Sequence, residues 1–363
     1  MKYSVIVSIN NGYEIVSNFL ETIIRNTNFD DGELIIILDG CNDIKTSSLL
    51  DHYKSKFSFI KVINSILQKG YSVANNIAVQ QSSGNYLVFI NCDVFPEKAS
   101  IEKLVDYLTK YPNTGAVQGK LVYPQNNLIQ STGHLFMKLY NSHIYKGKPS
   151  NHPLVMREGK RQALTTAFCA MSRNIFNKNN GFDECYYNAY EGMELTLKIY
   201  LSGKECIYYP NAVAYHITGS TRNNIQFDNE MAGRIFWSRW GNRITTDIQD
   251  YLYPQVSIEI KKHTYFLINC SSLFEWKEVL KSIEIETNGE INISERFGRS
   301  VNLYDNLPFE SLNYPSPYLF LCDDFKLLAG NYNWCKVRNN SKDIVIDSHG
   351  NIELFWDIVG LKR

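Results

Sequence analysis

Residues 1–95 alternate short apolar runs with segments in which apolar residues recur at helical spacing. The strand-like runs are 3–9, 33–38, 60–63 and 86–90, and the helix-like segments are 13–26, 46–57 and 72–82. Strands separated by helices pair in parallel through right-handed crossovers. Because these runs are apolar at nearly every position, we expect helices to cover both faces of the sheet. The pattern predicts an α/β fold built on a mostly parallel central sheet.

The chain has 363 residues, which is long for one hydrophobic core and indicates two domains. Beyond Gly241 strand-like runs dominate, so we expect one domain over 1–244 and an additional, mostly β module over 245–363. The expected strands of this module are 256–260, 264–269, 283–287, 290–293 and 342–356, with one helix near 273–281. Asn288-Gly289 is typical of a two-residue hairpin turn, and 348–351 is a weaker hairpin signal.

Charge and cysteine usage exclude several classes of protein. Lysines and arginines number 37, as do aspartates and glutamates, so no basic excess favours nucleic acid as a partner. The eight cysteines are scattered without paired or zinc-like spacing. The N-terminus enters a strand at once, leaving no room for a signal peptide, and no apolar run approaches the ~20 residues of a membrane span. We therefore expect a reduced, cytoplasmic protein.

Two acids follow predicted strands of the first domain. Asp39 comes directly after the run 33–38, and Asp93 ends the segment Phe89-Ile90-Asn91-Cys92-Asp93. The carboxyl ends of parallel strands open on one crevice, so both carboxylates are expected to face the same ligand. Such acids can accept bonds from a nucleoside or hold a divalent cation beside a diphosphate. The alternatives are a turn residue at Asp39 and a helix cap at Asp93.

Further polar candidates follow later in the domain. Glu191 and Glu194 open a segment of helical spacing, and His216 ends a short strand. Either glutamate can serve as a general base or be a plain helix carboxylate. His216 is either a metal ligand or an ordinary histidine at the end of a strand. The local pattern leaves each pair of alternatives open.

Several motifs in this domain occur in a familiar order. They are Ser4-Val5-Ile6-Val7-Ser8, Leu38-Asp39-Gly40-Cys41-Asn42-Asp43, 68–76, Asn91-Cys92-Asp93, 115–133, Asn180-Gly181-Phe182-Asp183-Glu184, 190–195 and 215–220. Together they resemble the motifs of family 2 glycosyltransferases with the GT-A fold, most like bacterial rhamnosyltransferase-type members of surface-polysaccharide pathways. The resemblance covers roughly residues 1–240. An ordered set of motifs is far more specific than any one of them.

The resemblance implies a role for each matching residue. The half 1–95 would bind the nucleotide and the half 96–244 the acceptor. Asp93 would coordinate Mn²⁺ or Mg²⁺ on the donor diphosphate, with His216 as a second ligand. Asp39 would contact the nucleobase, and the donor pocket would also contain Ser8, Asn10, Lys69, Gly70, Asn76 and Asn91.

Two positions depart from the family pattern. The first acid of the DxD metal motif is Asn91, which leaves Asp93 as the main ligand. The second acid of the Glu-Asp pair, usually the base, is Gly192. Either Glu191 or Glu194 must then act as the catalytic base, and we favour Glu191 because it would face the cleft from the helix start.

The resemblance implies a metal-dependent, inverting glycosyltransferase that moves a sugar from a UDP-, dTDP- or GDP-sugar to a bacterial surface glycan or its lipid-linked precursor. The rivals are a catalytically silent sugar-nucleotide or glycan-binding protein, favoured by Gly192, and a sugar nucleotidyltransferase. The last class needs a cationic loop after the first strand, and 8–12 contains no cation. Peripheral association with the inner face of the membrane and a homodimer through 245–363 remain open. So do acceptor binding and partner docking by that module.

Overall fold

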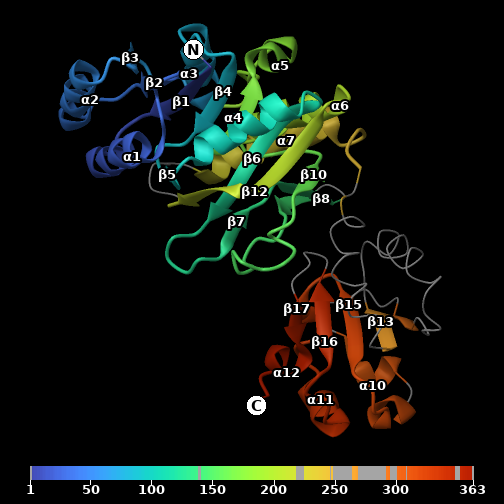
Figure 1. Ribbon diagram of the computed structural model, residues 1–363. Helices are drawn as coiled ribbons and strands as arrows, with labels where there is room; N and C mark the ends of the chain where they lie inside the picture. The colour runs from blue at the N-terminus through green and yellow to red at the C-terminus, as the bar shows by residue number, and fades with distance from the viewer. Residues whose placement is uncertain are drawn as a thin grey trace. The chain divides into compact units, whose positions relative to one another are not determined.

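The computed structural model describes residues 2–137, 140–217, 225–245, 247, 264–268, 292–294, 301–307, 309–347 and 352–361. The chain divides into two compact units (Figure 1). The first unit is Met1–Leu135 with Asn141–Ile244, and the second is Phe136–Tyr140 with Thr245–Arg363.

A 10-stranded sheet forms the centre of the first unit. Its order is β10-β12-β6-β11-β4-β1-β2-β3, with β5 and β7 paired beside β12 and β6. The strands β3, β2, β1 and β4 are parallel neighbours, whereas β11 is antiparallel to both β4 and β6. The strands are β1 (Tyr3–Ile9), β2 (Gly32–Asp39), β3 (Ile60–Ser65), β4 (Tyr86–Ile90), β5 (Val94–Pro96), β6 (Thr114–Val122), β7 (Ile129–Ser131), β10 (Gly159–Arg161), β11 (Phe168–Ser172) and β12 (Glu205–His216).

Helices cover both faces of this sheet (Figure 1). Alternate residues of β2 point to opposite faces, so Leu34 and Ile36 pack with one set of helices and Ile35 and Ile37 with the other. The first face carries α1 (Tyr13–Asn26), α2 (Ile44–Lys56) and α4 (Ser100–Lys110), and the second carries α3 (Tyr71–Gln80), α5 (Arg173–Lys178) and α6 (Glu191–Leu201). Every residue of β2 is buried, as expected for a sheet covered on both faces. The predicted α/β class is confirmed.

The end of β12 is brought to the nucleotide half by the short strand β5. β5 follows Asp93 directly and runs antiparallel to β12, with Val94 opposite His216. The backbone amide of Ile217 also donates to the carbonyl of Asp93 at 3.0 Å. This pairing places a residue from late in the chain beside the acid that ends β4.

A small two-stranded sheet of β8 (His134–Met137) and β9 (Tyr140–His143) lies beside β7 in the sequence. We call it the β8–β9 pair. Its base is tied to the first unit, because His134 N donates to Ala163 O at 2.9 Å and Ile144 N donates to Gly133 O at 3.0 Å.

The second unit contains a five-stranded sheet in the order β14-β13-β15-β16-β17. Numbered along the chain, this order is 2-1-3-4-5, with the first four strands parallel and β17 antiparallel to β16. Parallel neighbours require crossover connections, so this is a doubly wound arrangement and not a succession of hairpins. The strands are β13 (Thr264–Ile268), β14 (Asn292–Ser294), β15 (Tyr318–Cys322), β16 (Ile344–Asp347) and β17 (Ile352–Leu354).

The sequence correctly predicted an additional C-terminal sheet. It did not predict β15 or the short helices around it. These helices are α10 (Leu303–Asn306), η1 (Phe309–Asn313), η2 (Phe325–Leu327), α11 (Tyr332–Arg338) and α12 (Phe355–Ile358). The antiparallel β16 and β17 flank the weaker hairpin signal. The expected strands 256–260 and 283–287, the helix 273–281 and the turn at Asn288-Gly289 lie outside the described residues.

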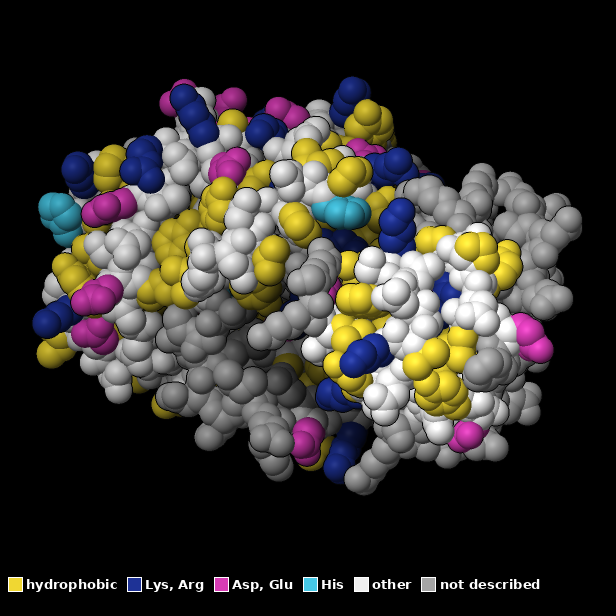
Figure 2. Space-filling model, turned by 90° about the horizontal axis from the view of Figure 1, so that it is seen from below, with side chains coloured by type: hydrophobic (Ala, Val, Ile, Leu, Met, Phe, Trp, Pro, Cys, Tyr) yellow, Lys and Arg dark blue, Asp and Glu magenta, His cyan; other side chains and the backbone are white. Residues whose placement is uncertain are grey.

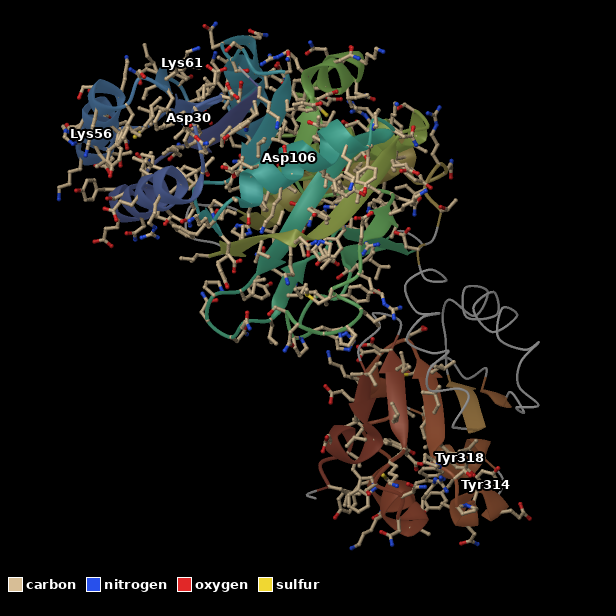
Figure 3. All side chains as sticks on the ribbon, in the orientation of Figure 1. Asp30, Lys56, Lys61, Asp106, Tyr314 and Tyr318 are labelled. Atoms are coloured by element: carbon tan, nitrogen blue, oxygen red, sulfur yellow. The ribbon has the colours of Figure 1, made fainter. Side chains whose placement is uncertain are left out.

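The second unit contains a buried ion pair. Arg338 and Asp343 have fully buried side chains, and Nε lies 2.7 Å from Oδ2. The guanidinium carbon also lies 3.6 Å from the centre of the Tyr318 ring. Tyr318 and Tyr314 stack with ring centres 5.7 Å apart (Figure 3). The aromatic face and the carboxylate together compensate the charge that burial would otherwise penalise.

The surface agrees with a chain of zero net charge. On the face shown in Figure 2, basic and acidic side chains are interspersed among hydrophobic ones. Among the described residues, no helix is both long and apolar enough to cross a membrane.

Candidate functional site

A pocket of about 650 Å³ opens at the carboxyl ends of β1, β2 and β4. Open parallel sheets bind their ligands at this edge. Seven of the predicted site residues line it: Ser8, Asn10, Asp39, Asn91, Asp93, Glu191 and His216. Lys69, Gly70, Asn76 and Glu194 are not among the lining residues. The structure thus brings together residues from five separate segments of the chain.

Asp39 joins the end of β2 to the start of α3. Its Oδ1 accepts from Lys69 N at 2.7 Å and its Oδ2 accepts from Gly70 N at 2.9 Å. The Asn10 side chain donates to the Asp39 carbonyl at 2.7 Å, which ties in the end of β1. Two amide donors stabilise the ionised carboxylate and fix its position on the pocket wall.

Lys69, Gly70 and Asn76 shape the loops around the pocket. Gly70 has a φ of 86°, and a Cβ there would lie 2.5 Å from the Tyr187 ring, so only glycine fits. Asn76 donates to Phe182 O at 2.9 Å and accepts from Phe182 N at 3.1 Å. This clamp holds the turn that leads to α6. Donor binding by these three residues stays a prediction.

The side chain of His216 lies between those of Asp93 and Gln130 and contacts both. His216 Nε2 lies 3.1 Å from Asp93 Oδ1, and His216 Nδ1 lies 2.6 Å from Gln130 Oε1. An amide oxygen only accepts, so the Nδ1 hydrogen of His216 is donated to Gln130. The lone pair of Nε2 in a neutral ring then points at the carboxylate of Asp93. Such an arrangement is repulsive unless a cation lies with both groups, either a proton on Nε2 or a metal ion.

The donor set at this point suits a hard or borderline divalent cation. One carboxylate and one imidazole nitrogen converge, and Asn91 supplies an amide on the same wall. Burial, and after it the charge of Asp93, raises the pKa of the neighbouring Cys92 thiol to about 12. Within the described part of the chain, no three His, Cys, Asp or Glu side chains form a complete metal cage. A metal held by Asp93 and His216 would therefore take its remaining ligands from substrate and water.

Glu191 and Glu194 have different surroundings although they share the first turn of α6. Glu191 is buried and lines the pocket. Glu194 instead accepts from Trp240 Nε1 at 3.1 Å and lies 3.4 Å from Lys198 Nζ and 3.7 Å from Arg239 Nη1. Trp240 and Arg239 belong to α7 (Ile225–Trp240), so Glu194 connects two helices. Of the two candidates for the base, Glu191 is the one that lines the pocket.

Thr166 takes the space that a side chain at position 192 would need. A Cβ built on Gly192 would lie 2.2 Å from Thr166 Oγ1 and 2.9 Å from Thr166 Cγ2. Thr166 is buried, lines the pocket, and receives a hydrogen bond from the Tyr71 hydroxyl at 3.3 Å. The glycine at this departure from the family pattern is thus a packing requirement of its neighbour.

Sequence reasoning gave no role to several residues on the pocket wall. They are Tyr71, Gln130, His134, His143, Lys146, Thr166 and Tyr190. Most lie on short strands or turns, where a few residues show no periodicity. Residues 134–143 show no regular alternation of polar and apolar residues, so no periodic signal in the sequence indicated the β8–β9 pair.

Comparison with known proteins identifies the first unit. Residues 4–179 match the sequence model described as Glycosyl transferase family 2. These residues form a family 2 glycosyl transferase domain. The resemblance drawn from the motifs is thereby confirmed, and its last part, from residue 180 on and including α6 and β12, lies beyond the matched range.

Two curated relatives and one solved structure are similar to this chain. The O-antigen biosynthesis protein RfbC of Myxococcus xanthus is 22% identical over 237 residues, covering 61% of this chain and 18% of its own length. The probable glycosyltransferase YdaM of Bacillus subtilis (strain 168) is 24% identical over 218 residues, covering 59% of this chain and 50% of its own. The crystal structure of GalNAc-T7 with UDP, GalNAc and Mn²⁺ has a TM-score of 0.54 at 16% identity and covers 70% of this chain and 50% of that chain.

The similarity to the solved structure concerns the fold, and the similarity to the curated relatives covers only part of their length. At 16% identity the GalNAc-T7 structure shows the fold of this family 2 domain, which is the GT-A fold. The chain spans half or less of the length of the two curated relatives.

The close approach of Gly192 and Thr166 predicts a coupled pair. Gly192→Ala should destabilise the protein by about 1–3 kcal/mol, because the added methyl overpacks the contact with Thr166. In a Thr166→Ala background the same substitution should cost less, because Oγ1 and Cγ2 are removed and only the contact with Cβ of residue 166 at 3.0 Å remains, and because alanine favours a helix over glycine. Urea unfolding of the four proteins of the cycle measures the coupling. Additive effects would contradict the steric account.

The hydrogen bond to Gln130 predicts the tautomer of His216. With Mg²⁺ present and at a pH of about 8.5, well above the ordinary histidine pKa, the side-chain ¹⁵N shifts of His216 should show a hydrogen on Nδ1. Gln130→Leu removes the acceptor and should abolish this preference, whereas Gln130→Glu should retain it. His216→Gln assigns the signals. An unchanged pattern in Gln130→Leu would show that Gln130 does not set the tautomer.

Proposed function

We propose that this chain is a metal-dependent, inverting glycosyltransferase that moves a sugar from a nucleoside diphosphate-sugar to a hydroxyl of a bacterial surface glycan. The observation that carries the proposal is one pocket of a family 2 domain containing Asp39, the Asp93–His216 pair and Glu191. The name of the Myxococcus relative, an O-antigen biosynthesis protein, supports the surface-glycan acceptor.

The donor would bind along the carboxyl edge of β1, β2 and β4. Asp39, with Ser8 and Asn10 beside it, would bind the nucleoside portion. Asp93 and His216 would hold Mn²⁺ or Mg²⁺ on the diphosphate, and the ion would stabilise the charge that develops on the leaving group. Gln130 orients His216 for this purpose, as partners of metal-binding histidines commonly do. The donor nucleotide would be UDP, dTDP or GDP.

Glu191 would act as the general base. In a single displacement, the acceptor oxygen forms a bond to the anomeric carbon while the bond to the diphosphate oxygen breaks. The hydroxyl proton passes to the Glu191 carboxylate. Glu191 is the first residue of α6, where the helix dipole favours the ionised form that a base needs. Burial beside the pocket keeps competing water from this carboxylate.

The second candidate function is a sugar-nucleotide or glycan-binding protein without transferase activity. Gly192 favours it, because the acid usually taken as the base is absent and Thr166 fills its place. The two functions differ in whether Glu191 moves a proton.

The setting that we propose is cytoplasmic, with the glycan precursor at the inner face of the cell membrane. The cysteines among the described residues are free thiols, which supports a reducing compartment. A role for the second unit in dimerisation or acceptor binding is part of the same proposal.

Loss of the metal ligand tests the function. Asp93→Ala should weaken Mn²⁺-dependent binding of the donor by at least about tenfold, which is about 1.4 kcal/mol, and should abolish nucleoside diphosphate release. UDP-, dTDP- and GDP-sugars are screened by calorimetry and by release of the diphosphate. Asp30→Ala, at an exposed acid of the same unit (Figure 3), is the matched control. Equal binding with and without Mn²⁺ would contradict the proposal, and synthesis of a nucleotide sugar from a sugar phosphate would indicate a nucleotidyltransferase.

Replacement of the base separates transferase from silent binder. Glu191→Gln should retain donor binding and lower diphosphate release by about 10²- to 10⁴-fold, the usual contribution of a general base. Glu194→Gln should act mainly on stability, because its contacts are with α7. Diphosphate release that persists in the Glu191→Gln, Glu194→Gln double variant would contradict the assignment of the base to either glutamate. Donor binding without release by the wild type would favour the silent binder.

A further inference from the structure

One side of the pocket has no role in the donor binding, metal binding or proton transfer proposed above. It is formed by the β8–β9 pair and the turn after it, and it presents His134, His143 and Lys146. The two imidazole rings lie with centres 4.7 Å apart, tilted by 32°. We call these three side chains the basic end of the pocket.

The backbone around the basic end is specifically shaped. Thr132 Oγ1 donates to Ile144 O at 2.7 Å, which holds the start of the turn. Tyr145 is buried yet has a φ of 58°, in the left-handed region that a tyrosine rarely adopts, and Gly147 follows with a φ of 82°. Strain of this kind persists only where the surroundings impose it, and it concentrates at binding sites. The turn thereby presents Lys146 at the mouth of the pocket.

The charges of the pocket are separated. Lys146 is the one lysine or arginine among the described residues that line it. Its ammonium makes no ion pair with the described carboxylates within 4 Å. The three carboxylates on the wall are Asp39, which holds two backbone amides, Asp93, which pairs with His216, and Glu191. A cation with no carboxylate partner beside two imidazoles is a receptor for an anion.

The imidazoles of the basic end are neutral at physiological pH. Burial, and after it the charge of Lys146, lowers the pKa of His143 to about 4. Burial, and after it His143, lowers the pKa of His134 well below its usual value. A neutral imidazole carries one N–H donor, and His134 and His143 donate theirs to the backbone carbonyls of Ser142 and Gly133, so the basic end offers one positive charge, that of Lys146.

The basic end belongs to the acceptor side of the pocket. The Tyr190 hydroxyl lies 3.2 Å from Asn141 Oδ1, which ties β9 to the residue that directly precedes Glu191. The acceptor hydroxyl has to lie within reach of Glu191 if that residue takes its proton. An anionic group carried by the acceptor would then fall beside β9 and the turn that follows it.

We propose that Lys146, on the turn that follows His143, binds an oxyanion of the acceptor, a phosphate or carboxylate that neighbours the sugar to be extended. The inference rests on the proposed function, since it takes Glu191 as the base. It defines the acceptor as an anionic glycan. The other source of the same chemistry is the donor diphosphate, and the experiment distinguishes the two.

The test uses glycerol 3-phosphate as a probe of the oxyanion site and neutral glycerol as its control, with no metal ion present. Binding to the full chain is followed by NMR titration of the histidine side-chain signals. Lys146→Met should weaken glycerol 3-phosphate binding about 5- to 10-fold, as expected for loss of one partly exposed charged contact. Lys103→Met, at an exposed lysine of α4, should leave it unchanged.

A second arm measures the Mn²⁺-dependent affinity for whichever of UDP, dTDP and GDP binds the wild type. Lys146→Met should change that affinity by less than about twofold, well under 1.4 kcal/mol. A loss of nucleotide affinity with intact glycerol 3-phosphate binding would assign Lys146 to the donor and overturn the inference. Equal binding of glycerol 3-phosphate by Lys146→Met and wild type would also overturn it. Failure of the wild type to bind any nucleotide would contradict the proposed function instead.

Discussion

The carboxylate of Asp39 is the interaction on which the pocket depends. It ends β2 and binds two consecutive amides, so the loop before α3 can take only one path. α3 then carries Asn76, whose amide clamps the backbone of Phe182. That turn leads to Glu191 at the start of α6. A single buried acid thus links the strand β2 to the helix that begins at Glu191.

The pocket separates its charges by position. Asp39 and Asp93 occupy the strand ends, where backbone amides and His216 balance them. Lys146 lies at the mouth, on a turn with two left-handed residues. A substrate with a diphosphate at one end and a second anion at the other would match this distribution once a metal ion neutralises the first. The arrangement favours two charged ligands over one.

Local pattern was sufficient for β1 to β4 and for placing Asp39 and Asp93 at the pocket, because Asp39 comes at the end of one apolar run and Asp93 shortly after another. The contact of His216 with Asp93 depends on pairing between β5 and β12, which no local period reveals, and only the order of motifs pointed to it. Gln130 and Lys146 lie on a three-residue strand and a turn, which are too short for any period. The second unit shows the same limit, since its helices are mostly of one turn or two and its parallel pairing is non-local.

The contact between Gly192 and Thr166 bears on how such chains are classified. A classification based on position 192 alone would place this protein among those that lack the second acid of the Glu-Asp pair. It would then be taken as inactive. The structure shows that positions 166 and 192 share one volume, so a bulky residue at either excludes a side chain at the other. The residue types at two such positions therefore have to be considered together. A route from glycine back to aspartate passes through threonine 166 first.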